Sequence, residues 1–201
     1  MTRIWLIRHG EPVAEALGRC YGSLDFGFSE TGRVQIQHVA DYLRTEPISA
    51  VYTSPRSRAR EGAKILTAAV SAPVLEVADD LREMDFGDFE GLTYDEIAAR
   101  NPELFRLWME NPTEVTFPNG ESFPEMRDRV LRAFDAIKRK HDGQTVALVT
   151  HGGVNRILLA NALQMPDSCI FRLAQEYAAI NLIEFMQGLP VVRLLNFVIR
   201  R

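Results

Sequence analysis

The chain has 201 residues and a formal net charge of −4 at pH 7, with 46% hydrophobic and 25% charged residues. This length suits one domain, because single hydrophobic cores grow to roughly 250 residues before chains divide. The slightly acidic balance gives no reason to expect a nucleic-acid or membrane partner. No stretch approaches the roughly 20 apolar residues of a membrane helix, and the first apolar run is too short for a signal peptide. Cys20 and Cys169 fit no metal-binding spacing and indicate free thiols, so we expect a cytoplasmic protein.

The first predicted element is a buried strand at 4–7, whose apolar residues end abruptly at Arg8, His9 and Gly10. Open α/β sheets bind ligands at the carboxyl ends of their strands, which is where Arg8 and His9 fall. A guanidinium can fork onto phosphate oxygens while an imidazole approaches phosphorus. Taken alone, the pair also fits a strand end that merely faces water.

A helix at about 29–44 and a strand at 50–53 come next. Ser54 and Pro55 then have the residue types of an N-cap and a first helical position, so a second helix is predicted at 55 to about 69.

Three arginines, Arg56, Arg58 and Arg60, fall in the first turns of that helix, where the helix dipole favours anions over cations. Helix N-termini bind phosphate readily, so a bound anion would satisfy the free N–H groups and the guanidiniums together. Extension into solvent stays open as an alternative for Arg56 and Arg60, and much less so for Arg58.

An acidic segment at 81–91 supplies candidates for proton transfer. Phosphoryl transfer to a histidine needs a proton for the departing oxygen and later a base for water. Glu83 is the candidate for both roles, with Asp85, Asp88 and Glu90 as alternatives. The segment also fits an acidic surface loop.

The segment at about 93–120 carries three prolines and, among charged residues, Phe105, Trp108 and Phe117. Such a segment between sheet elements suits a cap over the crevice that selects the substrate. Trp108 equally fits an anchor that holds the cap to the core. The candidates for an apolar wall facing an aromatic leaving group are Tyr21, Phe26, Phe28 and Phe86.

A helical stripe at 123–137 precedes a strand at 146–150, which runs into His151, Gly152 and Gly153 and then a helix through 160. The two glycines let backbone N–H groups approach a ligand closely. A lone histidine here is more often structural, but three strand ends that each carry cationic or imidazole groups predict a phosphoryl pocket.

Strands at 178–185 and 191–197 are predicted to form a hairpin at the end of the chain. Helices that alternate with strands indicate the α/β class. His38 and His141 are interpreted as surface residues.

Four motifs occur in an order that resembles the histidine phosphatase superfamily, also called the phosphoglycerate-mutase-like family. They are Arg8-His9-Gly10-Glu11, Thr53-Ser54-Pro55 with Arg58-Ala59, Leu81-Arg82-Glu83 with Gly87 and Glu90-Gly91, and Thr150-His151-Gly152-Gly153. The segments at 18–22, 24–32 and 118–123 and the tail that ends at 192–196 are similar to the α-ribazole phosphatase branch, and broad-specificity sugar-phosphate phosphatases share much of them.

The resemblance implies a three-layer α/β/α sandwich with a mostly parallel sheet and one antiparallel edge strand. One domain over residues 1–201 would carry a cap-like insertion at about 93–120. The implied activity is that of a histidine acid-type phosphatase, a phosphoric monoester hydrolase. Its substrate would be a small phosphorylated metabolite, with α-ribazole 5′-phosphate as a candidate. No metal and no cofactor are expected, and the molecule would be a monomer or homodimer.

The resemblance also implies roles for individual residues. His9 would attack phosphorus and become phosphohistidine, while Glu83 would protonate the leaving group and then activate water. Arg8, Arg58 and His151 would bind the phosphoryl oxygens and stabilise the transition state. The full set of implied substrate-binding residues is Arg8, Arg58, His151, Gly152, Tyr21 and Gly22.

Two positions depart from the family pattern, which commonly has a threonine after the first motif and an asparagine three residues later. Pro12 and Glu15 stand there. A carboxylate repels phosphate, so Glu15 must point away, pair with a residue such as Arg19, or meet a cationic substrate.

Two other functions stay open. A cofactor-dependent phosphoglycerate mutase must shield its phosphoenzyme from water and hold a second anionic group with extra basic residues. The residues after Glu83, which are Met84, Asp85 and Phe86, supply none, and this favours hydrolysis. A non-catalytic phosphoryl-binding module is disfavoured because the whole catalytic set is present.

Overall fold

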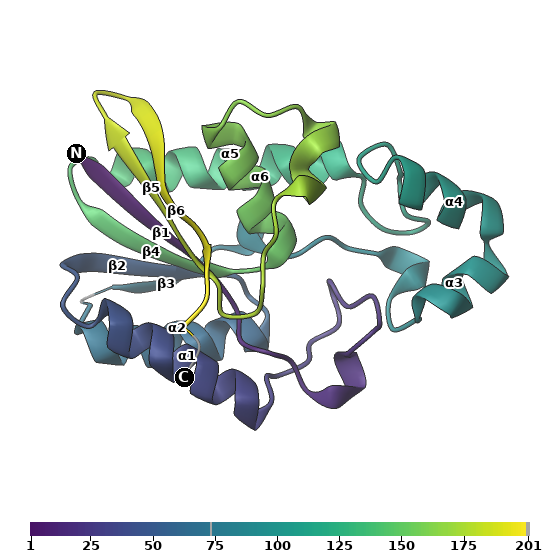
Figure 1. Cartoon of the computed structure of the whole chain (residues 1–201), viewed down its shortest axis with the longest axis horizontal. Helices are drawn as coiled ribbons and strands as arrows, with labels where there is room; N and C mark the ends of the chain where they lie inside the picture. The colour runs from purple at the N-terminus through teal and green to yellow at the C-terminus, as the bar shows by residue number, and fades with distance from the viewer. Residues whose placement is uncertain (73, 200–201) are drawn as a thin grey trace.

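The computed structural model describes residues 1–72 and 74–199 and places a six-stranded sheet between helices (Figure 1). The strand order is β3-β2-β4-β1-β5-β6. The strands are β1 (Thr2–Arg8), β2 (Ile48–Thr53), β3 (Leu75–Val77), β4 (Thr145–Thr150), β5 (Ile180–Met186) and β6 (Leu189–Phe197). The first four are mutually parallel, β5 runs antiparallel to β1, and β6 runs antiparallel to β5.

The three-layer, mostly parallel sandwich and the terminal hairpin are therefore confirmed. The expected antiparallel edge strand is wrong in its position. The antiparallel strand β5 lies inside the sheet, and β6 forms the edge. The reason is that the hairpin adds two strands beside β1, so the second of them covers the first and returns to the common direction.

Helices cover both faces of the sheet (Figure 1). One face carries α1 (Glu30–Leu43) and α2 (Ser57–Val70), and the other carries α5 (Phe123–Lys140) and α6 (Gly152–Ala162). Side chains of β1 alternate between the two layers, so Leu6 packs on the α5–α6 side while Ile7 packs on the α1–α2 side. This coverage explains why the strand reads as a continuous apolar run.

Local signals set most helix starts. Ser29 caps α1 by accepting a hydrogen bond from the Gly32 N–H at 3.1 Å, as its residue type predicts. The predicted start of α2 is wrong, because the helix begins at Ser57 with Arg56 in the N-cap position. The hydroxyl of Ser54 is engaged elsewhere, in the candidate site.

The segment at 93–120 contains α3 (Tyr94–Arg100) and α4 (Pro102–Glu110), which extend beyond the end of the sandwich (Figure 1). Trp108 is 7% exposed. Its ring centroid lies 5.2 Å from that of Phe117 and 5.9 Å from that of Phe86. This aromatic cluster joins α4 to the loop that follows β3, as expected of an anchor, and Trp108 also lines the cavity of the candidate site.

His141 is a correction, because its side chain is buried rather than on the surface. Its Nε2 lies 2.9 Å from the Tyr52 hydroxyl, and its Nδ1 lies 2.8 Å from Gln144 Oε1. Both ring nitrogens are satisfied, and this is how a histidine is accommodated in a core.

Among the described residues, no helix has both the length and the apolar character needed to cross a membrane.

Candidate active site

The site lies where three adjacent parallel strands end. Because β2, β4 and β1 are neighbours, the residues after each of them meet at one edge of the sheet. His9 follows β1 and His151 follows β4, and their ring centroids lie 5.3 Å apart. The structure thus brings together the strand ends that the sequence singled out.

His9 is held in one tautomer by the main chain. Its side chain is 2% exposed, and its Nδ1 lies 2.7 Å from the carbonyl oxygen of Gly10. A carbonyl can only accept, so Nδ1 carries the proton and the neutral ring leaves its lone pair on Nε2. Burial lowers the pKa of His9 well below its usual value, and the charges of Arg8 and Arg58 lower it further. The ring is therefore neutral at pH 7, with the lone pair of Nε2 unprotonated.

Gly10 has no room for a side chain, because a Cβ built there would lie 2.3 Å from the Gly32 carbonyl oxygen in α1. The backbone that fixes the His9 tautomer is thus packed directly against that helix.

His151 is fully buried, and its Nε2 lies 2.7 Å from the Ser54 hydroxyl. That hydroxyl also accepts a hydrogen bond from the Arg56 N–H at 3.2 Å. Burial, followed by the nearby charge of Arg58, lowers the pKa of His151 well below its usual value. If Ser54 donates to Nε2, the neutral ring carries its proton on Nδ1, which has no partner among the described residues. Nδ1 is then a free donor for an anion.

Arg58 is completely buried and holds the loop between β1 and α1. Its guanidinium donates hydrogen bonds to the carbonyl oxygens of Tyr21 and Leu24, each at 2.9 Å, and to that of Gly22 at 3.1 Å. Within residues 1–72 and 74–199, its Nε has no hydrogen-bond partner. Gly22 therefore lies behind the site and fixes Arg58, instead of lining the cavity as expected of a substrate-binding residue.

Arg8 is oriented by the last turn before β5. Its Nη1 donates to the carbonyl oxygen of Gln175, and its Cζ lies 4.1 Å from the Tyr177 ring centroid. The Gln175 side chain is fixed in turn by Asn155 at 3.1 Å and Asn181 at 2.9 Å. The Nε of Arg8 is buried and has no partner in the part of the chain that the structure describes. Arg8 and Arg58 thus each keep a donor free at the site.

Glu83 is the acidic residue that faces the cavity. Its Oε2 accepts a hydrogen bond from the Gly153 N–H at 3.1 Å, and its Oε1 accepts one from the Met84 N–H at 3.1 Å. The alternatives at 85, 88 and 90 do not line the cavity. Glu90 binds the N–H groups of the 22–24 loop, Asp85 binds the Gly87 N–H, and the exposed Asp88 binds Asn119.

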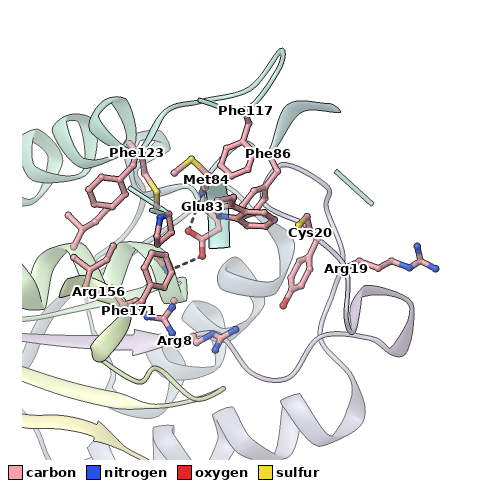
Figure 2. A pocket seen from close by; sticks show the side chains of 18 of the residues that line it. Arg8, Arg19, Cys20, Glu83, Met84, Phe86, Phe117, Phe123, Arg156 and Phe171 are labelled. Atoms are coloured by element: carbon pink, nitrogen blue, oxygen red, sulfur yellow. Dashed lines mark hydrogen bonds between the residues drawn. The ribbon is translucent and has the colours of Figure 1, made fainter. Parts of the chain in front are cut away.

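The cavity has a volume of about 470 Å³, with a charged end and a large apolar wall (Figure 2). Among the expected residues, those lining it are Arg8, His9, Tyr21, Arg58, Glu83, Phe86, Gly152 and Gly153. His151 is not among the lining residues. Phe28 instead packs in the α1–α2 core, and Phe26 packs edge-on against Tyr21 with ring centroids 6.1 Å apart. The rest of the apolar wall comes mainly from Trp108, Met109, Phe117, Phe123, Met126, Ile157, Ile170 and Phe171.

Arg156 is a cavity residue that the sequence reading missed. It lies one helical turn after Gly152 in α6, so the spacing of four residues could have placed it on the same helix face. Its Nε donates to the Leu173 carbonyl oxygen at 2.8 Å, and its Cζ lies 5.5 Å from the Phe171 ring centroid. Burial and then the charge of Arg8 lower its pKa. Among the described residues, the cavity lining therefore includes the guanidinium of Arg156 besides those of Arg8, Arg19 and Arg58.

The positions that depart from the family pattern lie away from the cavity. Pro12 is buried and bridges Phe28, while Glu15 is exposed in a short 3₁₀ helix, Ala14–Ala16. Arg19 lies 3.5 Å from Glu96 and does not pair with Glu15. Glu15 therefore takes the first of the three expected options and points away. Within the ranges 1–72 and 74–199, no group of three or more metal-ligating side chains is present.

The buried histidines make stability depend on pH. Because the pKa values of His9 and His151 are lowered by folding, the unfolded chain takes up protons below about 6.5 that the folded chain does not. The two neutral histidines therefore make their full contribution to the unfolding free energy above that pH. This contribution is lost as the pH falls through the lowered folded-state pKa. We expect each to add about 1.4 kcal/mol per pH unit to the slope of the unfolding free energy. Urea unfolding from pH 8 to 5 measures this slope, and it should decrease in His9→Ala; an unchanged slope would contradict the prediction.

Comparison with known proteins adds independent information. The sequence profile of the histidine phosphatase superfamily (branch 1) matches residues 4–198. The bifunctional protein Rv2228c of Mycobacterium tuberculosis is 39% identical over 197 residues, which are 97% of this chain and 54% of that protein. This chain therefore spans about half the length of that relative.

Two relatives match over nearly their whole length. Phosphoserine phosphatase 1 of Hydrogenobacter thermophilus is 30% identical, with 98% of this chain and 92% of that protein covered. The crystal structure of the α-ribazole phosphatase from Shigella flexneri superimposes with a TM-score of 0.88 at 28% identity, covering 97% of this chain and 96% of that chain.

Proposed function

Since the chain belongs to the histidine phosphatase superfamily, branch 1, we propose that it is a phosphomonoester hydrolase that works through a phosphohistidine without a metal ion. The observation that carries the proposal is the state of His9, a buried neutral imidazole with its lone pair on Nε2. Arg8 and Arg58, each with a free donor, and the carboxylate of Glu83 border the same cavity.

In the first step, Nε2 of His9 forms a bond to phosphorus while the bond from phosphorus to the leaving oxygen breaks. Protonated Glu83 gives its proton to that oxygen, so the alcohol departs neutral. Arg8, Arg58 and Nδ1 of His151 stabilise the negative charge on the phosphoryl oxygens. In the second step, Glu83 takes a proton from water as the water oxygen attacks phosphorus. The P–N bond breaks, and neutral His9 and inorganic phosphate are formed.

The substrate we propose is a small phosphorylated metabolite with a bulky apolar part, and α-ribazole 5′-phosphate is our specific candidate. The aromatic and aliphatic wall of the 470 Å³ cavity supports an aromatic leaving group. The similarity to an α-ribazole phosphatase supports the same choice. We further propose that residues 93–120 act as the cap of a single-domain enzyme, because Trp108, Met109 and Phe117 from this segment line the cavity.

Phosphate release in the presence of a chelator tests this proposal. The panel contains α-ribazole phosphate, 3-phosphoglycerate, phosphoserine, sugar phosphates and an aryl phosphate. We expect turnover that the chelator leaves unchanged, with a preference of a hundredfold or more for α-ribazole phosphate, equivalent to about 2.7 kcal/mol in the transition state. Slow phosphate release at a similar rate from every ester would support the phosphohistidine mechanism and contradict α-ribazole 5′-phosphate as the substrate. Loss of activity with chelator would contradict metal independence.

A mutase remains the second candidate because of Arg156. Its guanidinium supplies a cation that the residues after Glu83 do not, and it could hold a second anionic group. Conversion of 3-phosphoglycerate to its isomer without phosphate release would favour the mutase. Neither turnover nor isomerisation would favour a phosphoryl-binding module.

Glu83→Gln is expected to lower kcat/KM for an alkyl phosphate about 100-fold, the low end for general acid catalysis, because glutamine still donates a hydrogen bond. An aryl phosphate should lose far less, since its leaving group needs little proton assistance. Steady-state kinetics on both esters give the comparison. Equal losses on the two esters would move the acid role to another residue.

A further inference from the structure

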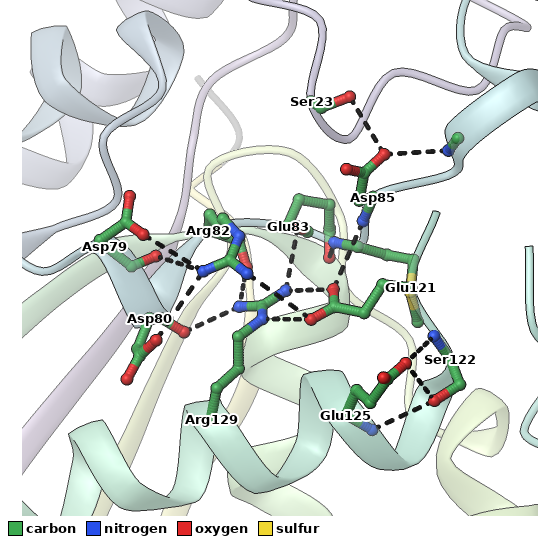
Figure 3. Close-up of polar contacts among 12 residues, drawn as sticks. Ser23, Asp79, Asp80, Arg82, Glu83, Asp85, Glu121, Ser122, Glu125 and Arg129 are labelled. Carbon is green, nitrogen blue, oxygen red and sulfur yellow. Dashed lines mark hydrogen bonds and ion pairs between the residues drawn. The ribbon is translucent and has the colours of Figure 1, made fainter. Parts of the chain in front are cut away.

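The loop that carries Glu83 has little regular structure of its own. After the short 3₁₀ helix Asp79–Leu81 it continues to the next short 3₁₀ helix, Gly87–Phe89. The carbonyl oxygens of Asp80, Arg82 and Glu83 all accept hydrogen bonds from one guanidinium, that of Arg129 in α5 (Figure 3). The donor–acceptor distances are 2.8, 2.7 and 3.1 Å. A single side chain thus fixes the main chain on both sides of the Glu83 Cα.

The other edge of the same guanidinium is engaged by Glu121. Nε of Arg129 lies 2.6 Å from Oε1 and Nη2 lies 2.7 Å from Oε2 of this carboxylate. Arg129 is 3% exposed and Glu121 is 8% exposed. All five N–H donors of a guanidinium are used in this arrangement. Because every donor of this buried pair is hydrogen-bonded, the Arg129 and Glu121 side chains are fixed in one conformation.

Glu121 also forms hydrogen bonds to the main chain of the loop after Glu83. Its N–H donates to the Asp85 carbonyl oxygen at 2.9 Å, and its Oε2 accepts from the Asp85 N–H at 3.5 Å. Glu83 therefore stands between two sets of main-chain anchors, one from Arg129 and one from Glu121. Neither residue lines the cavity that holds His9.

From these contacts we infer that Arg129 and Glu121 are positioning residues that hold the Glu83 carboxylate in place for proton transfer. The inference rests on the proposed function of Glu83 as acid and base. Lysine cannot replace Arg129, because an ammonium has three donors and no planar fork for three carbonyls and a carboxylate. The positioning of Glu83 should therefore depend on the planar guanidinium of Arg129 and its five donors, and not on its positive charge alone.

The test compares Arg129→Lys with Glu83→Gln on an alkyl and an aryl phosphate. We expect Arg129→Lys to lower kcat/KM for the alkyl ester at least tenfold more than for the aryl ester. In the Glu83→Gln background the same change should add little to that difference, because the acid it positions is already gone. Arg129→Met with Glu121→Met gives a second variant, since replacing a whole buried pair by apolar side chains is tolerated better than breaking it.

Phe134→Leu is the matched control. Phe134 lies in α5, is 2% exposed and packs against Phe185, away from the loop and the cavity. A loss of stability alone should leave the ratio of alkyl to aryl turnover unchanged in this variant. Equal losses on both esters in Arg129→Lys, with an unequal loss in Glu83→Gln, would overturn the inference and leave the proposed function intact.

A wild-type protein that hydrolyses neither ester would contradict the proposed function instead. As a second measurement, crystal structures of the wild type and of Arg129→Lys show where the Glu83 carboxylate lies. We expect the contact between the Glu83 carboxylate and the Gly153 N–H to be lost in the variant. A contact that stays as it is in the wild type would overturn the inference.

Discussion

His9→Ala is expected to lower kcat/KM by a factor on the order of 10⁵, because a covalent mechanism loses its whole reaction path with its nucleophile. Alanine leaves the arginines in place, so the variant should still bind phosphate. The fold should remain, since alanine fits where the imidazole stood. Single-turnover kinetics with a ³²P-labelled ester add a direct measurement, because the wild type should form an acid-labile phosphoprotein that the variant does not.

His38→Ala is the control for that experiment, since His38 lies half-buried on α1 and outside the cavity. It should retain wild-type turnover. Substantial activity in His9→Ala, or a phosphoprotein signal that persists in it, would refute the assignment of the nucleophile.

Arg58→Ala should cost about 2–5 kcal/mol of transition-state stabilisation, the range seen when one partner of a buried charge pair is removed. Two roles add together here. The guanidinium contributes positive charge at the site, and it also holds the carbonyls of Tyr21, Gly22 and Leu24. We therefore expect kcat/KM to fall by about a thousandfold, with a smaller loss of thermal stability.

Arg60→Ala is the matched control on the same helix, because Arg60 is exposed and two residues further along α2. Its kinetics should match the wild type. A loss below tenfold in Arg58→Ala would place Arg58 outside the group that stabilises the transition state. A thousandfold loss in both variants would point instead to a general effect of charge on this helix.

Strand ends and apolar periodicity are local signals, and they predict the α/β class and the meeting of His9, Arg58 and His151. The mostly parallel sheet and the choice of Glu83 among the acidic residues come from the resemblance to the family. The contacts that orient these residues could not be predicted. Ser54 reads as a helix cap, and its hydroxyl instead binds His151. That partner lies 97 residues away in the chain, so no local pattern indicates it.

His141 was misread for the same reason, because it resembles a surface residue until Tyr52 supplies its partner. The sequence does not single out Arg129, whose partners Glu121 and three main-chain carbonyls lie on other segments. A polar residue is buried when distant segments satisfy it. The sequence shows the polar side chain, but it does not show which distant groups will form hydrogen bonds with it in the fold.

The main-chain hydrogen bond to His9 has a consequence for how this protein can change. Because the acceptor is the carbonyl of Gly10, no side-chain replacement removes it, and the protonation pattern of the nucleophile is inherited with the fold. A Cβ at Gly10 would lie 2.3 Å from the Gly32 carbonyl oxygen, and a Cβ at Gly32 would lie 2.2 Å from the Glu11 carbonyl oxygen, so added bulk at either position must move the backbone. Residue 32 in α1 is therefore restricted to glycine by the chain that follows His9, although it does not line the cavity.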